Sequence, residues 1–399
     1  MKKILFYCQY LSGMGHLVRS TEIVRNLVKD FQVYFITGGP PIQGFEIPPS
    51  VEVINLPALW LEDGEFRVED RFNSVDEVKE IRKNQLIAEC DRIQPDCIIT
   101  EFFPFGRHKL LFELIPLLEH VRSTQPSIKI VCSLRDVIKQ GFFPQEEELI
   151  CQLANQYFDL ILFHSDPIFQ RFETTFPRYK DIQCDVQYTG FVAQSPSSPE
   201  KANVASESEP MILVSVGGGR IGYELLEAAI NSSWLLEMEI PHKIQIFTGP
   251  FLPESEFIML QKAALNRGNV KLDRYASDLL SYMEKAALSI SLTGYNTTMN
   301  ILRTGVRAIV VPLGHDNQDR EQLVRTSKLE QLGIVEVIRP NDLNHIHLTQ
   351  KIITCLKKKP VGRTSNLFDL EGAPKTASFL KALLNGKIPA ASAVYSNPK

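Results

Sequence analysis

Three turns in the sequence combine glycines with residue types that can bind phosphate or move a proton. The first spans residues 12–20 (SGMGHLVRS), follows an apolar run, and contains Gly13, Gly15 and His16. Glycines after a buried strand let the backbone approach a ligand, and the helix that follows presents its N-terminus to an anion. Because an ordinary imidazole titrates near neutrality, His16 is a candidate general base. A packed ring or a helix cap is the alternative.

The second turn spans residues 215–220 (SVGGGR). It contains Gly217, Gly218, Gly219 and Arg220. The glycines expose backbone N–H groups, and the guanidinium adds a positive fork suited to phosphate. A sharp connection between a strand and a helix explains the same glycines without a ligand.

The third turn, residues 293–300 (TGYNTTMN), predicts a helix start with small polar side chains. The residues concerned are Gly294, Tyr295, Asn296, Thr297, Thr298 and Asn300. Unpaired N–H groups and the helix dipole at such a start favour an anion such as a diphosphate, although an ordinary N-cap is the simpler reading. In the polar segment 314–326, the residue types suited to hold sugar hydroxyls are Gln318, Asp319, Glu321 and Gln322. A solvated helix start is the alternative there.

Each turn follows a predicted strand in a regular alternation of strands and helices. Several apolar runs lack in-and-out alternation, which is typical of parallel strands covered on both faces. The pattern therefore predicts an α/β fold with doubly wound sheets. The predicted strands are 4–8, 32–36, 51–56, 96–100, 128–133, 160–163, 186–189, 211–216, 243–248, 270–272, 288–292, 308–312 and 334–338.

A chain of 399 residues exceeds the usual size of one hydrophobic core, so we expect two domains. Proline, serine and charged residues concentrate in 194–210, which predicts a linker. We expect two Rossmann-like domains facing across a cleft, with ligands at the carboxyl ends of their strands. The predicted parts are the domains 1–193 and 211–372, a helix at 373–386, and a disordered tail at 387–399.

Composition narrows the classes of function. Hydrophobic residues make up 44% and charged residues 23%, and the mixed charges sum to −4, which leaves no basic face for nucleic acid. Seven scattered cysteines without a C-x-x-C pair indicate free thiols in a reducing, cytoplasmic compartment. No run approaches the ~18 apolar residues of a membrane span, so any membrane contact is expected to be peripheral.

Residues 102–109 (FFPFGRHK) combine aromatic and basic side chains. They form either a lip facing a membrane or acceptor, or part of the core.

Together these blocks resemble the glycosyltransferases of the GT-B fold. The resemblance is greatest to the family 28 type, which contains the N-acetylglucosaminyltransferase that completes lipid II in peptidoglycan synthesis. It is most specific in residues 270–302 and 307–333. The first half is also similar to a group of predicted glycosyltransferases, in TEFFPFGRHKL, SLRDVI, FHSDP and YTGFV.

The resemblance implies a role for each matching position. The loop with Gly13, Gly15 and His16 would lie against the donor phosphates and the acceptor. The donor-binding residues implied in the second half are Gly217, Gly218, Gly219 and Arg220 at a second glycine turn, Arg274 and Tyr275 beside the nucleobase, Gly294, Tyr295, Asn296, Thr297 and Thr298 at the diphosphate, and Glu321 and Gln322 at the sugar. Asn300 stands where the family has a glutamate for the ribose hydroxyls, which leaves the nucleotide open.

The reaction implied is an inverting, metal-independent transfer from a nucleoside diphosphate sugar, UDP-linked N-acetylhexosamine being favoured, with no other cofactor. The first domain takes the acceptor, a sugar, a lipid-linked molecule or a small molecule, and the second takes the donor. His16 is the candidate base, Glu101 the reserve, and Arg135 and Asp136 position the acceptor. The location implied is the cytoplasm, with peripheral contact at the inner face of the membrane.

Two other functions remain open. Nucleotide-sugar 2-epimerases and hydrolases share this architecture, and one hydrolase group has a similar Gly-x-Gly-His-x-x-Arg start, here Gly13, Gly15, His16 and Arg19. The other alternative is a non-catalytic protein that binds nucleotide-sugars.

Overall fold

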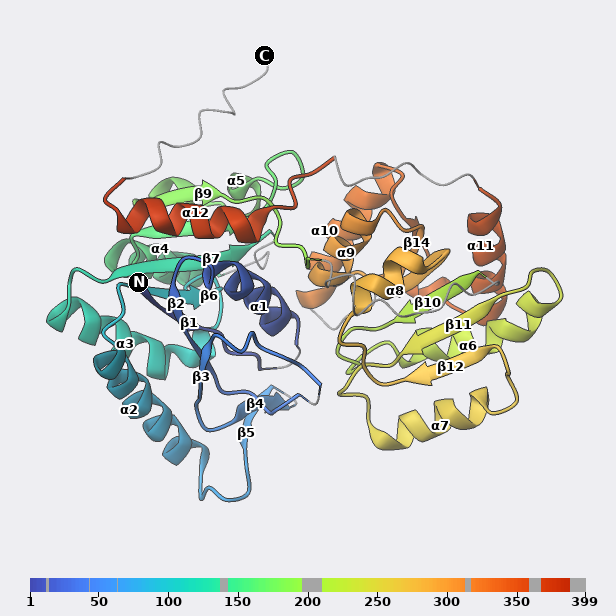
Figure 1. Cartoon of the computed structure of the whole chain (residues 1–399), viewed down its shortest axis with the longest axis horizontal. Helices are drawn as coiled ribbons and strands as arrows, with labels where there is room; N and C mark the ends of the chain where they lie inside the picture. Colours follow the sequence, from blue (N-terminus) through green and yellow to red (C-terminus); the bar gives the residue numbers. More distant parts are fainter. Residues whose placement is uncertain are drawn as a thin grey trace, which may run out of the picture. The chain divides into compact units, whose positions relative to one another are not determined.

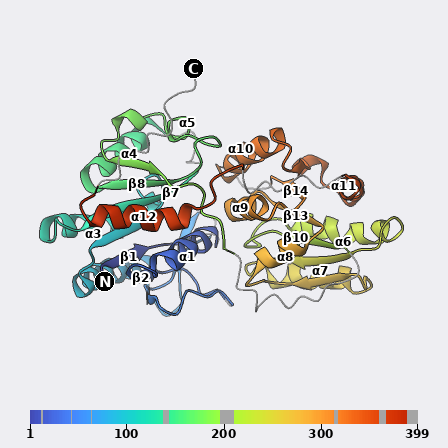
Figure 2. The ribbon, with the colours of Figure 1, turned by 45° about the horizontal axis from the view of Figure 1, so that its top comes forward.

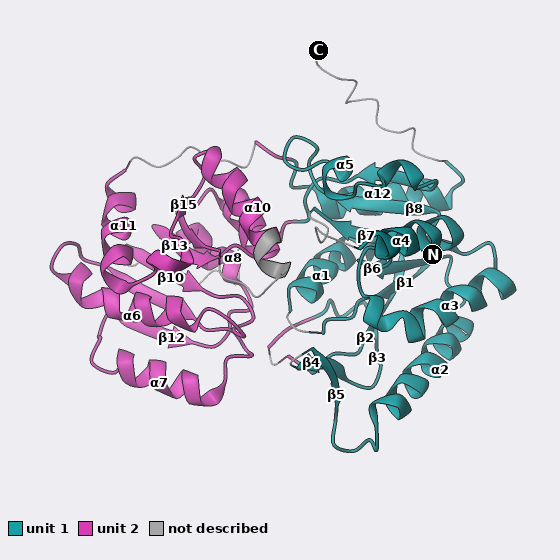
Figure 3. Ribbon diagram, turned by 180° about the vertical axis from the view of Figure 1, so that it is seen from behind, with its two compact units in different colours: residues 1–41, 47–192, 369–399 teal, residues 42–46, 193–368 magenta. Residues whose placement is uncertain are grey.

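The chain folds into two compact units, each built around its own parallel sheet (Figures 1 and 3). Unit 1 comprises residues 1–41, 47–192 and 369–399, and unit 2 comprises residues 42–46 and 193–368. The computed structural model describes residues 1–11, 14–42, 44–62, 64–136, 143–195, 210–312, 317–358 and 367–387, with the backbone alone at 317–320.

Unit 1 contains a seven-stranded sheet in the order β3-β2-β1-β6-β7-β8-β9, in which every pairing is parallel. The order reverses between the neighbours β1 and β6, and ligands of open α/β sheets bind beyond the carboxyl ends of strands at such a point. The strands are β1 (Lys3–Tyr7), β2 (Gln32–Thr37), β3 (Glu52–Asn55), β6 (Cys97–Glu101), β7 (Lys129–Arg135), β8 (Leu160–His164) and β9 (Asp185–Tyr188).

Helices cover this sheet because its central strands are apolar throughout. In β1, Ile4 to Tyr7 are at most 1% exposed, which matches a strand packed on both faces. The helices are α1 (Gly15–Leu27), α2 (Val75–Ile93), α3 (Leu111–Thr124), α4 (Pro144–Tyr157), α5 (Phe172–Thr175) and α12 (Gly372–Leu384), with 3-10 turns η1 (His108–Leu110) and η2 (Tyr179–Asp181). An antiparallel hairpin of β4 (Leu59–Glu62) and β5 (Glu65–Val68), which the sequence pattern did not predict, follows β3.

The last helix, α12, belongs to unit 1 and packs against α1 (Figure 2). The returning chain is anchored where Phe191 N donates to Asp369 O at 2.7 Å and Gly372 N donates to Phe191 O at 2.9 Å. A Cβ on Gly372 would lie 2.6 Å from the carbonyl oxygen of Gly190, so this approach of two backbones needs glycine. Unit 1 is therefore assembled from both ends of the sequence.

Unit 2 contains a six-stranded parallel sheet in the order β12-β11-β10-β13-β14-β15. Its order reverses between β10 and β13, the strands that precede the second and third glycine turns. The strands are β10 (Met211–Ser215), β11 (Lys243–Phe247), β12 (Val270–Asp273), β13 (Leu288–Leu292), β14 (Ala308–Val311) and β15 (Glu336–Val337). The helices are α6 (Tyr223–Glu237), α7 (Glu254–Ala264), α8 (Leu279–Lys285), α9 (Tyr295–Thr304), α10 (Asn317–Gln331) and α11 (His345–Lys357), with a 3-10 turn η4 (Pro340–Asp342).

The predicted α/β class with doubly wound parallel sheets is confirmed in both units. Most of the predicted linker and all but the first residue of the predicted tail lie outside the described residues. Within the described part of the chain, none of the helices has the length and apolar character needed to cross a membrane.

Candidate active site

His16 and Glu101 meet at the point where the strand order of unit 1 reverses. His16 lies in the first turn of α1, directly after β1, and Glu101 is the last residue of β6. The imidazole Nδ1 lies 2.5 Å from the Glu101 Oε1. Sequence reasoning had named them as alternative bases, whereas the structure joins them in one dyad. Gly15 is exposed at the start of α1, and Gly13 lies outside the described residues.

Glu101 is a fully buried carboxylate held by positive groups. The Arg19 guanidinium contacts Oε1, and Arg107 Nη2 lies 3.4 Å from Oε2. Burial alone would raise the pKa of Glu101, but the interactions with His16, Arg19 and Arg107 outweigh it and bring the pKa below its usual range. Glu101 therefore stays ionised and accepts hydrogen bonds, which suits it to orienting the imidazole rather than to acting as the base itself.

His16 is a neutral imidazole in this arrangement. Removal from water and the charges of Arg107 and Arg135 lower its pKa to about 3, against the opposing effect of Glu101. With Glu101 ionised, Nδ1 carries the proton and donates a hydrogen bond to the carboxylate. The lone pair of Nε2 is then available to a substrate. The side chain keeps 19% of its surface exposed. The dyad can therefore accept a proton at Nε2, and Glu101 would stabilise the imidazolium that forms.

The segment after β6 supports the dyad through a strained backbone. Phe102 and Arg107 have φ values of 67° and 66°, in the left-handed region that non-glycine residues seldom adopt. The Phe102 ring packs against His16, with centroids 5.9 Å apart, and the Arg135 guanidinium lies 4.9 Å from its centroid. A Cβ on Gly106 would lie 2.5 Å from that ring. Phe102 thus places His16 and Arg135 beside one another.

The remaining aromatic residues of this segment belong to the core. Phe103 and Phe105 are fully buried, so the core alternative describes them and they cannot form an exposed lip. Arg135, at the end of β7, is partly exposed, and the next residue, Asp136, is buried.

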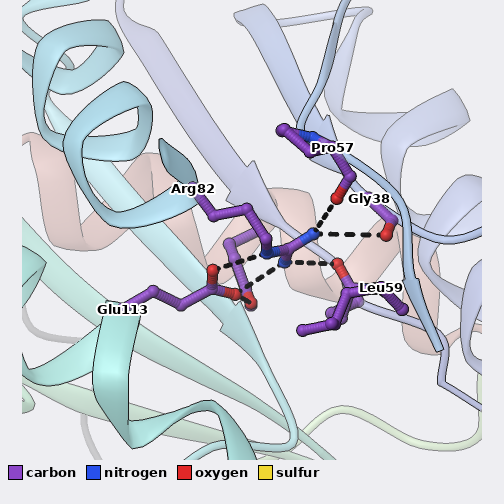
Figure 4. Close-up of polar contacts among 7 residues, drawn as sticks. Gly38, Pro57, Leu59, Arg82 and Glu113 are labelled. Atoms are coloured by element: carbon purple, nitrogen blue, oxygen red, sulfur yellow. Dashed lines mark hydrogen bonds and ion pairs between the residues drawn. The ribbon is translucent and has the colours of Figure 1, made fainter. Parts of the chain in front are cut away.

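Arg82, from α2, ties together the chain segments that follow β1, β2 and β3 (Figure 4). Its guanidinium makes five hydrogen bonds, equal to its number of N–H groups. The acceptors are Glu113 Oε2 at 2.8 Å and Oε1 at 2.7 Å, Gln9 Oε1 at 2.9 Å, Gly38 O at 3.2 Å and Pro57 O at 2.7 Å. The hydroxyl of Tyr7 also donates to Glu113, and all of these side chains are buried. No sequence motif indicated this network.

A second buried polar chain lies on the strands next to Glu101. Ser133, which pairs with Glu101 in the sheet, lies 2.7 Å from His164 Nε2, and His164 Nδ1 lies 2.8 Å from Thr189 Oγ1. Because Thr189 donates its hydroxyl proton to Gly190 O, His164 donates from Nδ1 and accepts from Ser133 at Nε2. Burial, with Arg19 nearby, lowers the pKa of His164 to about 3. His164 is therefore neutral and fixed in one tautomer.

In unit 2, α10 holds the turn at the start of α9. Gly294 is the N-cap of α9 and has no side-chain cap, and a Cβ added to it would meet open space. Thr293 donates to Gln322 Oε1 at 3.3 Å and accepts from Thr326 at 2.8 Å, and Arg325 Nη1 donates to Thr293 O at 3.1 Å. Gln322 therefore supports the turn, while its neighbour Glu321 is partly exposed.

The residues around the first turn of α9 differ in burial. Asn296 and Thr297 are partly exposed, and Tyr295 is buried. Thr298 and Asn300 are also buried, and neither Thr298 Oγ1 nor Asn300 Oδ1 has a partner among the described residues. The other end of the Asn300 amide donates to Gln194 Oε1 at 2.7 Å.

The glycine turn after β10 packs backbone to backbone on the segment after β11. Gly217 and Gly219 have positive φ values of 68° and 86°, and a Cβ on Gly219 would collide with the carbonyl oxygen of Thr248. Gly218 accepts a hydrogen bond from Phe251 N at 2.9 Å, and the Arg220 guanidinium lies 5.0 Å from the Phe251 ring centroid. Of the three glycines in this turn, Gly217 alone has open space where a Cβ atom would lie. These glycines therefore have a packing function whether or not they bind phosphate.

The predicted nucleobase residues have protein partners. Arg274 donates to Leu252 O at 2.9 Å, pairs with Glu254 at 2.5 Å, and lies 4.1 Å from the Phe257 ring centroid. Tyr275 lies beside Gly44 within unit 2. The backbone carbonyl of Arg274, the residue after β12, accepts a hydrogen bond from Gly249 N at 2.8 Å.

Solved structures share this fold over the whole chain. The calicheamicin glycosyltransferase CalG4 is 15% identical with a TM-score of 0.62, covering 97% of this chain and 100% of its own. The MurG of Acinetobacter baumannii is 15% identical with a TM-score of 0.55, at the same coverages. A putative UDP-N-acetylglucosamine 2-epimerase from Listeria monocytogenes is 12% identical with a TM-score of 0.62, covering 100% of this chain and 99% of its own. None of the curated proteins matches the sequence.

Two parallel doubly wound units with these neighbours define the GT-B fold of glycosyltransferases. Residues 212–374 match the glycosyltransferase family 28 C-terminal domain. The second half of the chain therefore carries the family 28 domain that the sequence resemblance implied. Within the described residues, no group of three or more His, Cys, Asp or Glu side chains is arranged to hold a metal ion.

Proposed function

We propose that the protein transfers a hexosyl group from a nucleoside diphosphate sugar to an acceptor hydroxyl, with inversion at the anomeric carbon. The observation that carries this proposal is the His16–Glu101 dyad at the carboxyl ends of β1 and β6. A neutral imidazole oriented by a buried carboxylate is suited to take a proton from a hydroxyl. The proposal assigns activation of the acceptor to unit 1 and binding of the donor to unit 2.

In the proposed step, Nε2 of His16 accepts the acceptor hydroxyl proton as the oxygen forms a bond to the anomeric carbon. The bond from that carbon to the diphosphate breaks, and the nucleoside diphosphate leaves with the bonding electron pair. Attack opposite the leaving group inverts the anomeric centre. Glu101, which contacts Nδ1, stabilises the imidazolium during this transfer.

On the donor side, the first turn of α9 is proposed to bind the diphosphate, because Gly294 has no side chain to fill the open space at its N-terminus. The helix dipole would stabilise the negative charge of the leaving group, with Arg220 as an additional cation. A UDP-linked N-acetylhexosamine is the proposed donor, on the strength of the resemblance to the lipid II enzyme. No metal ion or further cofactor takes part in this scheme.

A 2-epimerase is the second candidate, favoured by the Listeria monocytogenes structure that covers the whole chain. The two reactions differ in their need for an acceptor. We therefore propose incubating the purified protein with carbon-13-labelled UDP-N-acetylglucosamine, alone and with pooled sugar, lipid-linked and small-molecule acceptors. Transfer predicts a new glycoside of inverted configuration in the acceptor pools alone. An epimer or free sugar formed without an acceptor would replace the transferase assignment.

The dyad is tested with His16→Ala. Loss of a general base typically lowers kcat by about 10²–10⁴-fold, whereas binding of UDP by unit 2, followed by thermal shift, should be preserved. Unchanged turnover would remove His16 from the mechanism. Binding of UDP by the native protein without turnover in any acceptor pool would favour the non-catalytic alternative.

A further inference from the structure

Two arginines of unit 1, the buried Arg82 and the partly exposed Arg107, differ in how many of their N–H groups have protein acceptors. Arg82 makes five hydrogen bonds to protein acceptors. Arg107 makes one, to Glu101 Oε2 at 3.4 Å, and its Nε is buried without a partner among the described residues. A distance of 3.4 Å is longer than the usual 2.7–3.2 Å range for such bonds. Four of the five N–H groups of Arg107 are therefore without a protein acceptor in the described structure.

Arg107 is also held in a backbone conformation that disfavours it. Its φ of 66° lies in the left-handed region, where an L-residue with a large side chain is strained. The conformation is fixed by its neighbours, since Leu110 N donates to Arg107 O at 2.7 Å and the His108 ring contacts Pro104 O at 2.8 Å. Arg107 thus combines backbone strain with unmet hydrogen bonding next to a candidate base. This combination is typical of a residue that binds a ligand.

The charge around the dyad is positive. Arg19 and Arg107 both contact the single carboxylate of Glu101, and Arg135 lies over Phe102, the ring that packs on His16. Asp136, the residue after Arg135, is buried and already has a partner. Three guanidinium groups and one carboxylate thus surround a neutral imidazole. The Arg107 side chain keeps 13% of its surface exposed, so it is accessible to solvent.

We propose that Arg107, assisted by Arg135, binds a phosphate or carboxylate group of the acceptor, so that the acceptor of this enzyme is anionic. The inference rests on the proposed function, since it adds the acceptor's charge to that reaction. A planar guanidinium with free N–H groups fits two oxygens of such an anion. An anion at Arg107 and Arg135 would also offset the charges that oppose protonation of His16, so the base would strengthen when the acceptor binds.

The test uses inorganic phosphate as the probe and the His16 ring signals in the NMR spectrum of the full-length protein, assigned with His16→Gln. The titration is carried out with and without millimolar UDP. Phosphate should shift the His16 signals saturably in both conditions, and Arg107→Met should weaken this binding at least about tenfold. Arg67→Met, an exposed arginine of the β4–β5 hairpin, is the matched control and should bind phosphate like the native protein.

The outcomes separate the possible sources of the anion. Loss of phosphate binding on adding UDP would overturn the proposal, because the site would then belong to the donor diphosphate. Native affinity in Arg107→Met, or no saturable shift in the native protein, would also overturn it. If Arg107→Met fails to fold, Arg107→Lys, which keeps the charge but not the two-pronged geometry, should fold and still bind phosphate more weakly. Phosphate binding does not depend on turnover, so failure of the transferase assay alone would refute the proposed function and not this site.

Discussion

The His16–Glu101 pair separates two tasks that one side chain performs poorly. The proton acceptor must be neutral and accessible, whereas the group that stabilises its charged form must stay ionised and fixed. Glu101 is buried among positive groups and His16 is partly exposed, so each side chain lies in the environment that its task needs. The opposite assignment, with Glu101 as the base, would require the carboxylate to give up its contacts with two guanidinium groups.

His164 predicts a measurable dependence of stability on pH. Its pKa of about 3 in the folded protein lies below the unfolded value of ~6.5. Between these values the unfolded chain binds the extra proton, so the stabilising contribution is complete above pH ~6.5 and is lost as the pH falls towards 3. One such group changes the free energy of unfolding by up to about 1.4 kcal/mol per pH unit. His164→Gln should therefore flatten the fall in stability between pH 6.5 and 4.

Urea denaturation at pH 7, 6, 5 and 4 measures this slope for the native protein and the variant. A glutamine can accept from Ser133 through its carbonyl, so the variant should fold at pH 7 with a loss of about 1–2 kcal/mol. Equal slopes in the two proteins would show that His164 takes up no additional proton on unfolding.

At the scale of single residues, the sequence identified candidate catalytic side chains but not the residues that contact them. His16 was identifiable because it directly follows a glycine turn after an apolar strand, and Glu101 because it ends one. Their pairing depends on β1 and β6 being neighbours in the sheet, although the paired residues Ile4 and Cys97 are 93 positions apart in the sequence. Phe102 and Arg107 lay within the segment 102–109 that the sequence indicated as a lip or as core, but their individual significance could not be recognised, because it lies in φ values and unmet hydrogen bonds.

At the scale of elements, Arg82 acts on three loops at once. It joins Gln9, Gly38 and Pro57, which follow β1, β2 and β3. Arg82→Met would remove the guanidinium that neutralises the buried Glu113 carboxylate, so we expect a loss of about 3–5 kcal/mol in the free energy of unfolding. Hydrogen exchange should accelerate first in the segments after these three strands, and the His16 loop begins from one of them.

Two further variants show whether the ion pair or its surroundings matter. Arg82→Met combined with Glu113→Leu should recover part of the loss, because no buried charge then lacks a partner. Arg67→Ala breaks an exposed pair with Glu62 and should cost less than about 1 kcal/mol. A similar small loss in Arg82→Met would mean that the network contributes little to holding the loops.

The glycine turns of unit 2 predict opposite responses to the same substitution. Gly294 has a φ of −64° and open space at its Cβ position, so Gly294→Ala should fold normally. If a diphosphate lies there, the methyl group should weaken UDP binding by roughly tenfold, or about 1.4 kcal/mol. Gly219→Ala should destabilise the fold by about 2 kcal/mol or more, because its φ is 86° and its Cβ would collide with Thr248.

Calorimetric titration with UDP and thermal unfolding of both variants provide the measurements. Native UDP affinity in Gly294→Ala would count against the proposed phosphate site. A fully stable Gly219→Ala would mean that the turn can rearrange away from the segment after β11.

Much of the element order was predictable because parallel strands buried on both faces read as continuous apolar runs. The hairpin of β4 and β5 was not, since its strands have four residues each and are only partly buried. The glycines at 217–219 predicted a turn correctly, but their contact with Gly249 comes from a segment 30 residues away, which no local pattern encodes.

At the scale of the whole molecule, each unit has its own core, and unit 1 depends on α12. Leu380, on α12, and Leu260, on α7 of unit 2, are both fully buried. A buried leucine replaced by alanine typically costs about 2–5 kcal/mol. Leu380→Ala should therefore lower the stability of unit 1, including α1 with His16. Leu260→Ala should lower the stability of unit 2.

Hydrogen exchange read by mass spectrometry distinguishes these responses. Faster exchange should be confined to β1, β2 and α1 in the first variant and to β10, β11 and α7 in the second. Faster exchange in both units for either variant would show that the two cores unfold together.

The return of α12 to unit 1 has a consequence for the order of events during protein synthesis. A ribosome adds about 5–20 residues per second, and residues 193–368 separate the bulk of unit 1 from the segment that completes it. Nascent unit 1 must then wait on the order of ten seconds or longer with the α12-facing side of α1 uncovered. Unit 2 can finish folding within that interval, so the half of the protein that is translated first would be the last to mature.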